Sequence, residues 1–70
     1  MMSNLTFDLA CKAIILQCSN EYARAYARAG IGMEGKEAKI QALYILNNIT
    51  HWRGGDSKEV RAFLKEFAKG

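Results

Sequence analysis

Apolar and polar positions follow a helical period along most of the chain. Apolar residues recur at spacings of three and four, and no segment alternates as a half-buried strand does. Glycines interrupt the pattern at 30–32, at 35 and at 54–55. We therefore predict an all-α, three-helix bundle, with helices over about 4–29, 34–53 and 57–69, in one domain spanning residues 1–70.

The first predicted helix has an unusually broad apolar side. Its polar residues fall in an arc of about 100°, so apolar residues cover more than half of the circumference. Two shorter helices are too few to cover this side, and we interpret the excess as a self-association face that completes the bundle by dimerisation. Its expected members are Ile14, Ile15, Cys18, Tyr22 and Tyr26. A break at Ser19–Asn20 is the alternative, since both residue types favour helix N-caps.

Local signals indicate where the predicted helices end and begin. Gly30 is placed as a left-handed residue after the first helix, followed by the apolar contact that Ile31 provides. Asp56 and Glu59 have the spacing of a capping box at the start of the third helix. The third helix then carries one apolar stripe for the core, formed by Val60, Phe63, Leu64 and Phe67.

The second predicted helix has two faces of different character. One apolar arc is expected in the core: Ala38, Ala42, Ile45, Leu46, Ile49 and Trp52. The other face mixes apolar, aromatic and polar groups, as interfaces commonly do. We predict that it binds a protein partner through Ile40, Leu43, Tyr44, Asn47 and His51.

Composition narrows the class of protein. Half of the 70 residues are hydrophobic and the formal net charge is only +3, which is typical of a folded chain and not of a disordered one. No apolar run approaches the roughly 18 residues of a membrane span. Residues 1–4 lack the basic start and cleavage site of a secretory signal. We expect a cytoplasmic protein that does not enter a membrane.

The two cysteines are predicted to be free. Within one helix, Cys11 and Cys18 lie about 10.5 Å apart along the axis, beyond the roughly 7 Å that a disulfide spans. Free thiols are typical of a reducing compartment and pack as small apolar side chains. A chain this short is near the lower size limit for a core that stands alone, and without a bridge or metal a second copy is the remaining means of stabilisation.

Residues that carry chemistry are few. His51 is the single histidine, so Cys11, Cys18 and His51 offer three ligands where a zinc site takes four. Nothing in the local sequence pairs either cysteine with His51 as a nucleophile with its base. The glycines at 30–32 lack the strand and lysine of a phosphate loop. We expect a non-enzymatic protein with no metal and no cofactor.

Basic residues gather in the third helix. Its second sector consists of Lys58, Arg61, Lys65 and Lys69, and residues 36–70 carry the whole net charge. Like charges at i,i+4 repel, so a helix that keeps them is a candidate for phosphate or acidic-protein contact. The preceding turn, residues 54–57, loosely resembles a helix-turn-helix connection. A small nucleic-acid-binding regulator that uses this helix is therefore the alternative function.

The main hypothesis is a small regulatory or accessory module that acts by stoichiometric protein binding as a homodimer. In size and character the chain resembles the compact accessory proteins that phages and mobile elements encode, which often bind a host factor. That resemblance implies a protein partner, but it does not identify that partner.

Overall fold

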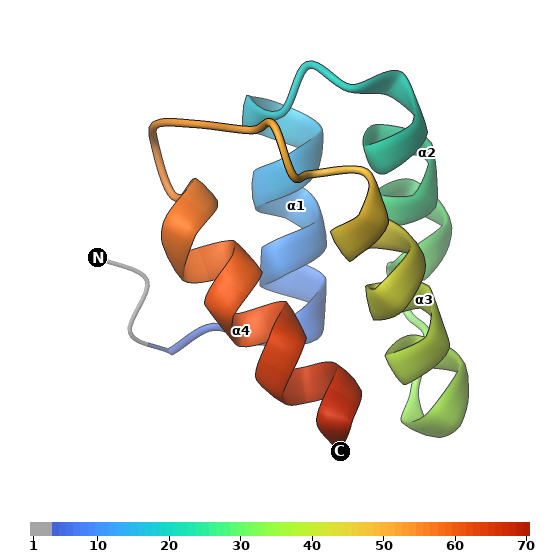
Figure 1. The fold of residues 1–70 in the computed structure, drawn as a ribbon. Helices are drawn as coiled ribbons and strands as arrows, with labels where there is room; N and C mark the ends of the chain where they lie inside the picture. The colour runs from blue at the N-terminus through green and yellow to red at the C-terminus, as the bar shows by residue number, and fades with distance from the viewer. Residues whose placement is uncertain (1–3) are drawn as a thin grey trace.

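The computed structural model describes residues 4–70, and all regular structure in this range is helical (Figure 1). It contains four helices: α1 (Phe7–Gln17), α2 (Glu21–Gly30), α3 (Gly35–Asn47) and α4 (Ser57–Lys69). Each helix runs antiparallel to the next, and α1 and α3 both pack against α2 and α4. The all-α prediction is confirmed, whereas the prediction of three helices is wrong. The secretory-signal prediction rests mainly on Met1–Ser3, which lie outside the described residues.

The first predicted helix is two helices. α1 ends at Gln17, and α2 begins after Asn20, whose side-chain Oδ1 accepts a hydrogen bond from the Ala23 amide at 2.9 Å. Arg24 Nε donates to the carbonyl oxygen of Ile15 at 3.1 Å and ties the start of α2 to the end of α1. The break at Ser19–Asn20 therefore replaces the continuous helix over 4–29.

The second predicted helix ends six residues early, at Asn47. The Asn48 side chain donates to the Tyr44 carbonyl at 2.9 Å, which takes an acceptor from the last turn. Beyond it the backbone continues in turns, and Ile49 and Trp52 remain buried there. Arg61 Nη1 donates to the carbonyls of Ile49 (3.3 Å) and Trp52 (2.6 Å), which satisfies oxygens that a continuing helix would have paired.

The core confirms the apolar arcs predicted for the later helices. Its largest fully buried side chains are aliphatic: Ile14, Ile45, Ile49, Leu64 and Val60. Phe67 stacks on Phe7 with ring centroids 4.9 Å apart, and this contact joins α4 to α1. Such offset aromatic pairs stabilise a core beyond the area they bury.

The start of α4 is fixed by a residue of α1. Asp56 is the N-cap, but its side chain does not cap the helix as the predicted capping box requires. Gln17 Nε2 donates to Asp56 Oδ2 at 2.7 Å, and Gln17 Oε1 accepts from the Asp56 amide at 3.0 Å. This reciprocal pair closes the ring of helices at one end.

Gly30 is needed for close packing and not for a left-handed turn. It is the last, buried residue of α2, and the positive φ angle (88°) belongs to Gly32 instead. A Cβ at position 30 would lie 3.1 Å from the Phe7 ring and 3.2 Å from Cys11 Sγ. The prediction of a left-handed Gly30 is therefore wrong, because the approach of α2 to α1 requires a residue without a side chain.

Gly30→Ala is expected to destabilise the protein by about 1 kcal/mol. Overpacking against Phe7 costs about 1–3 kcal/mol, and the better helix propensity of alanine recovers up to about 1 kcal/mol of it. Urea unfolding measures the difference. Phe7→Leu removes two of the three close contacts, so the double variant should lose less than the sum of the single losses. A strictly additive pair would contradict this account.

Candidate functional site

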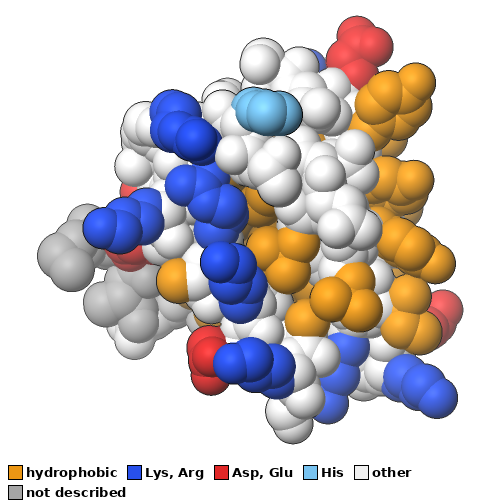
Figure 2. Space-filling view, viewed as in Figure 1, with side chains coloured by type: hydrophobic (Ala, Val, Ile, Leu, Met, Phe, Trp, Pro, Cys, Tyr) orange, Lys and Arg blue, Asp and Glu red, His pale blue; other side chains and the backbone are white. Residues whose placement is uncertain are grey.

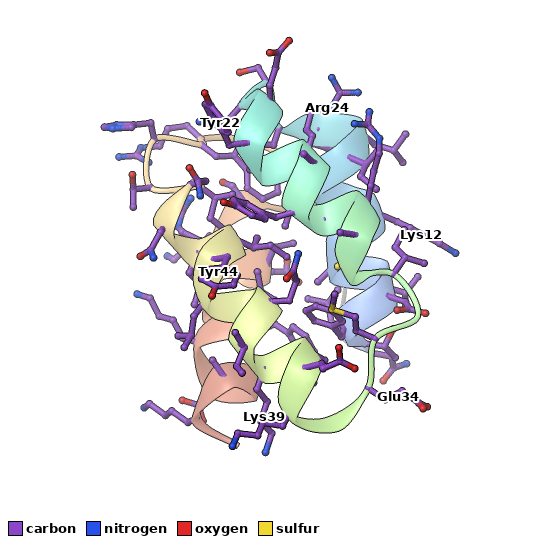
Figure 3. All side chains as sticks on the ribbon, turned by 90° about the vertical axis from the view of Figure 1, so that its right-hand side faces the viewer. Lys12, Tyr22, Arg24, Glu34, Lys39 and Tyr44 are labelled. Carbon is purple, nitrogen blue, oxygen red and sulfur yellow. The ribbon has the colours of Figure 1, made fainter. Side chains whose placement is uncertain are left out.

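An exposed aromatic face spans α2 and α3. We call it the aromatic face, and it consists of Tyr22, Tyr26, Ile40 and Tyr44. Tyr22 and Tyr26 are one helical turn apart on α2, as are Ile40 and Tyr44 on α3. The rings of Tyr26 and Tyr44 stack with centroids 5.6 Å apart, and Figure 3 shows both helices side by side. The two surfaces predicted separately thus meet in one face.

This face depends on how α2 and α3 are held together. Gln41 Nε2 donates to the carbonyl oxygen of Tyr26 at 2.8 Å, and Gln41 itself is buried. Tyr22 is 71% exposed and Tyr44 is 49% exposed, so both offer large apolar area to a partner. Patches of this kind are common at protein interfaces.

The predicted self-association residues divide between core and surface. Ile14 and Cys18 are buried in the monomer, so neither forms part of an outer face. Ile15 is half-buried, whereas Tyr22 and Tyr26 are exposed. The prediction assumed one continuous helix, and the break at Ser19–Asn20 separates the two groups.

The predicted partner-binding residues also divide. Ile40, Leu43 and Tyr44 are exposed on α3, and Asn47 is exposed at its end. His51 lies beyond the helix, where it lines a different feature. The helical spacing that placed His51 on this face ends at Asn47.

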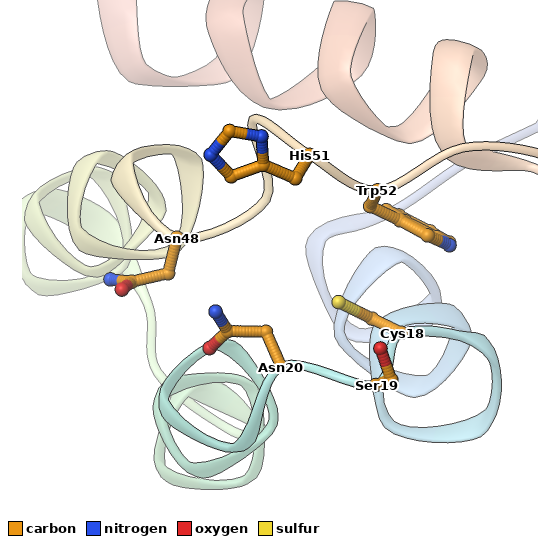
Figure 4. A pocket seen from close by; sticks show the side chains of 6 residues that line it. All are labelled: Cys18, Ser19, Asn20, Asn48, His51 and Trp52. Carbon is orange, nitrogen blue, oxygen red and sulfur yellow. The ribbon is translucent and has the colours of Figure 1, made fainter.

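His51 borders a small cleft of about 190 Å³ (Figure 4). The lining residues come from the α1–α2 and α3–α4 connections: Cys18, Ser19, Asn20, Asn48, His51 and Trp52. A cysteine, a histidine and two asparagines in one cleft are a combination that sequence spacing did not reveal. Both asparagines hold the backbone, Asn20 at Ala23 and Asn48 at Tyr44. Among the described residues, no hydrogen bond joins Cys18 to His51, so the cleft lacks an activated nucleophile.

The other cysteine is shielded from chemistry. Cys11 is fully buried, and burial, followed by the carboxylate of Asp8, raises the pKa of its thiol from 9.0 to about 12. A thiol that stays protonated is a poor nucleophile and a poor metal ligand. Within residues 4–70, no group of three or more His, Cys, Asp or Glu side chains is arranged to hold a metal ion.

Basic side chains form a row along α4 in Figure 2. Of the four residues predicted there, Arg61 is engaged with the Ile49 and Trp52 carbonyls, and Lys69 pairs with Glu66 at 3.4 Å. Lys58 and Lys65 are exposed. The spacing in sequence identified the row but not the structural duty of Arg61, because its acceptors lie nine and twelve residues earlier.

Sequence reasoning missed an apolar groove between α3 and α4. It has a volume of about 460 Å³, and its apolar lining consists of Leu43, Leu46, Ala62 and Ala68. Lys65, Glu66 and Lys69 line it from α4. Figure 2 shows apolar side chains exposed between the basic row and α3. The groove needs two helices at once, so no single-helix pattern predicts it.

Comparisons with known proteins leave the assignment to this geometry. No protein-family model, curated protein or solved structure matches the chain. None of the helices within residues 4–70 has the length and apolar character needed to cross a bilayer.

The raised pKa of Cys11 predicts loss of stability at alkaline pH. The unfolded chain ionises this thiol above about pH 9, whereas the folded chain keeps it protonated to about pH 12. The folded state therefore binds more protons in this window, and the thiol lowers the free energy of unfolding by up to about 1.4 kcal/mol per pH unit. Urea unfolding from pH 7 to 11 should show a steeper decline above pH 9 in the wild type than in Cys11→Ala. Equal slopes would contradict the assignment.

Proposed function

We propose that the protein is a small non-enzymatic module that acts by stoichiometric protein binding, and that two copies associate through the aromatic face. The stacked Tyr26–Tyr44 pair carries this proposal, because it joins two helices into one exposed surface. Tyrosines at the centre of an interface often contribute most of its binding energy. In this role the protein is a regulatory or accessory factor in the cytoplasm.

The absence of charge on this face favours a second copy as its occupant. Tyr22, Tyr26, Ile40 and Tyr44 are all uncharged, whereas the molecule has a net charge of +3. Two like-charged copies repel when their basic surfaces meet. An uncharged face lets them approach without that cost, and a two-fold axis would bring the same tyrosines together from both sides.

Tyr44→Arg should weaken the dimer by at least about 30-fold in dissociation constant, because it removes about 2 kcal/mol of aromatic contact and places two like charges in the interface. Sedimentation equilibrium over micromolar concentrations measures the effect. Leu16→Arg is the matched control, since Leu16 is 83% exposed on α1 and the charge change is the same. A wild type that stays at 7.8 kDa, or equal weakening by both variants, would overturn the dimer.

The row of basic side chains along α4 favours a second candidate, a nucleic-acid-binding regulator. Its test should spare Arg61, whose replacement would disturb the fold. Lys58→Glu/Lys65→Glu should abolish salt-dependent binding to duplex DNA, with a slope loss of about 0.9 per phosphate contact. Lys12→Glu/Lys36→Glu changes the charge equally at other exposed sites and should still bind. A wild type that produces no mobility shift at low salt would exclude this candidate.

A further inference from the structure

The groove between α3 and α4 has the shape of a docking site for a helix. Leu43 and Leu46 lie at i and i+3 on α3, and Ala62 faces them from α4. Leu43 is 52% exposed and Ala62 is exposed, so the groove is open along its length and no side chain of the monomer fills it. Two packed helices with small residues between them present the ridges and grooves into which a third helix fits.

The charges around the groove are mostly positive. Lys65 and Lys69 line it from α4, and Lys39 Nζ lies beside Gly70, at the end of α4. Glu66 is the one acidic residue in the lining, and it pairs with Lys69. Three lysines against one glutamate leave a net charge of +2 around an apolar floor. Figure 2 shows basic side chains beside this floor and at its lower end.

We propose that this groove binds an acidic amphipathic helix of a protein partner. The apolar side of that helix lies on Leu43, Leu46, Ala62 and Ala68, and its flanking carboxylates meet Lys39, Lys65 and Lys69. Lysine side chains suit this position, because their aliphatic stems extend the apolar floor while the ammonium groups stay at the rim. The inference rests on the proposed function, protein binding, and names the chemistry of the partner.

Charge distinguishes this occupant from the others. A second copy would bring its own basic α4 surface to the groove, which is unfavourable, and the uncharged aromatic face suits that copy better. A nucleic acid would meet the lysines but would leave the leucine floor without an apolar contact. An acidic amphipathic helix satisfies both the floor and the rim.

Two synthetic peptides test the proposal by NMR titration of the isotopically labelled full chain. Each has about 15 residues, with leucines at i, i+3, i+4 and i+7 spacing. One carries glutamate at the flanking positions and the other carries lysine. The acidic peptide should shift the amide signals of Leu43, Leu46 and Ala62 saturably, and its affinity should fall with added salt. The basic peptide should leave these signals in place.

Substitutions locate the site. Ala62→Glu should weaken binding of the acidic peptide by at least about tenfold, because it occupies the groove and repels carboxylates. Ala29→Glu makes the same change at an exposed position of α2 and should bind as the wild type does. Lys65→Glu should also weaken binding, whereas Lys12→Glu on α1 should not. Circular dichroism of each variant verifies that it is folded.

Other outcomes overturn one proposal without the other. Binding of both peptides alike, or shifts confined to other residues, would overturn the groove assignment. Loss of the acidic-peptide response in a wild type that still dimerises through Tyr44 would leave the proposed function standing. A monomeric wild type that binds the acidic peptide would overturn the aromatic-face dimer and support the groove. Retention of peptide binding by Tyr44→Arg would show that the two surfaces act separately.

Discussion

The turn between α1 and α2 is the constraint on which the remaining structure depends. A single helix over residues 4–29 would be about 39 Å long, whereas the longest dimension of the molecule is 28 Å. Asn20 caps α2 and Arg24 holds the Ile15 carbonyl, so the chain reverses there at no loss of hydrogen bonds. The reversal lays α2 on α1 and buries Ile14 and Cys18 within the monomer.

A second constraint lies between α3 and α4, where the chain stays close to the core without being helical. Ile49 and Trp52 are buried, so their backbone carbonyls need partners within the protein. Arg61 supplies donors to both, and Arg53 adds a contact of 3.2 Å to the Trp52 oxygen. Charged donors make strong hydrogen bonds, which explains why an arginine inside the basic row has a structural role.

Sequence periodicity predicted the parts of the fold that one helix determines by itself. The stripe on α4 is an example, because Val60 and Leu64 share a helix face whatever packs on it. The close approach at Gly30 was not predictable in this way, since Phe7 and Cys11 belong to another helix. The same limit applies to the candidate surfaces.

The tyrosines of the aromatic face illustrate that limit. Tyr26 and Tyr44 were each identified as interface residues, but their contact depends on the packing of α2 against α3. The groove was missed for the same reason, because Leu46 appears as a core residue when α3 is considered alone. In the fold it is half-buried and its remaining surface lines the groove.

Leu43 relates the two proposed surfaces to each other. It lines the groove and is adjacent in sequence to Tyr44 of the aromatic face. A helix bound in the groove would cover Leu43 and order the exposed side of α3 on which Ile40 and Tyr44 also lie. Ordering that is completed by one ligand lowers the entropic cost for the next. An acidic helix would therefore favour association of two copies, unless both ligands need the same atoms of Leu43, in which case they compete.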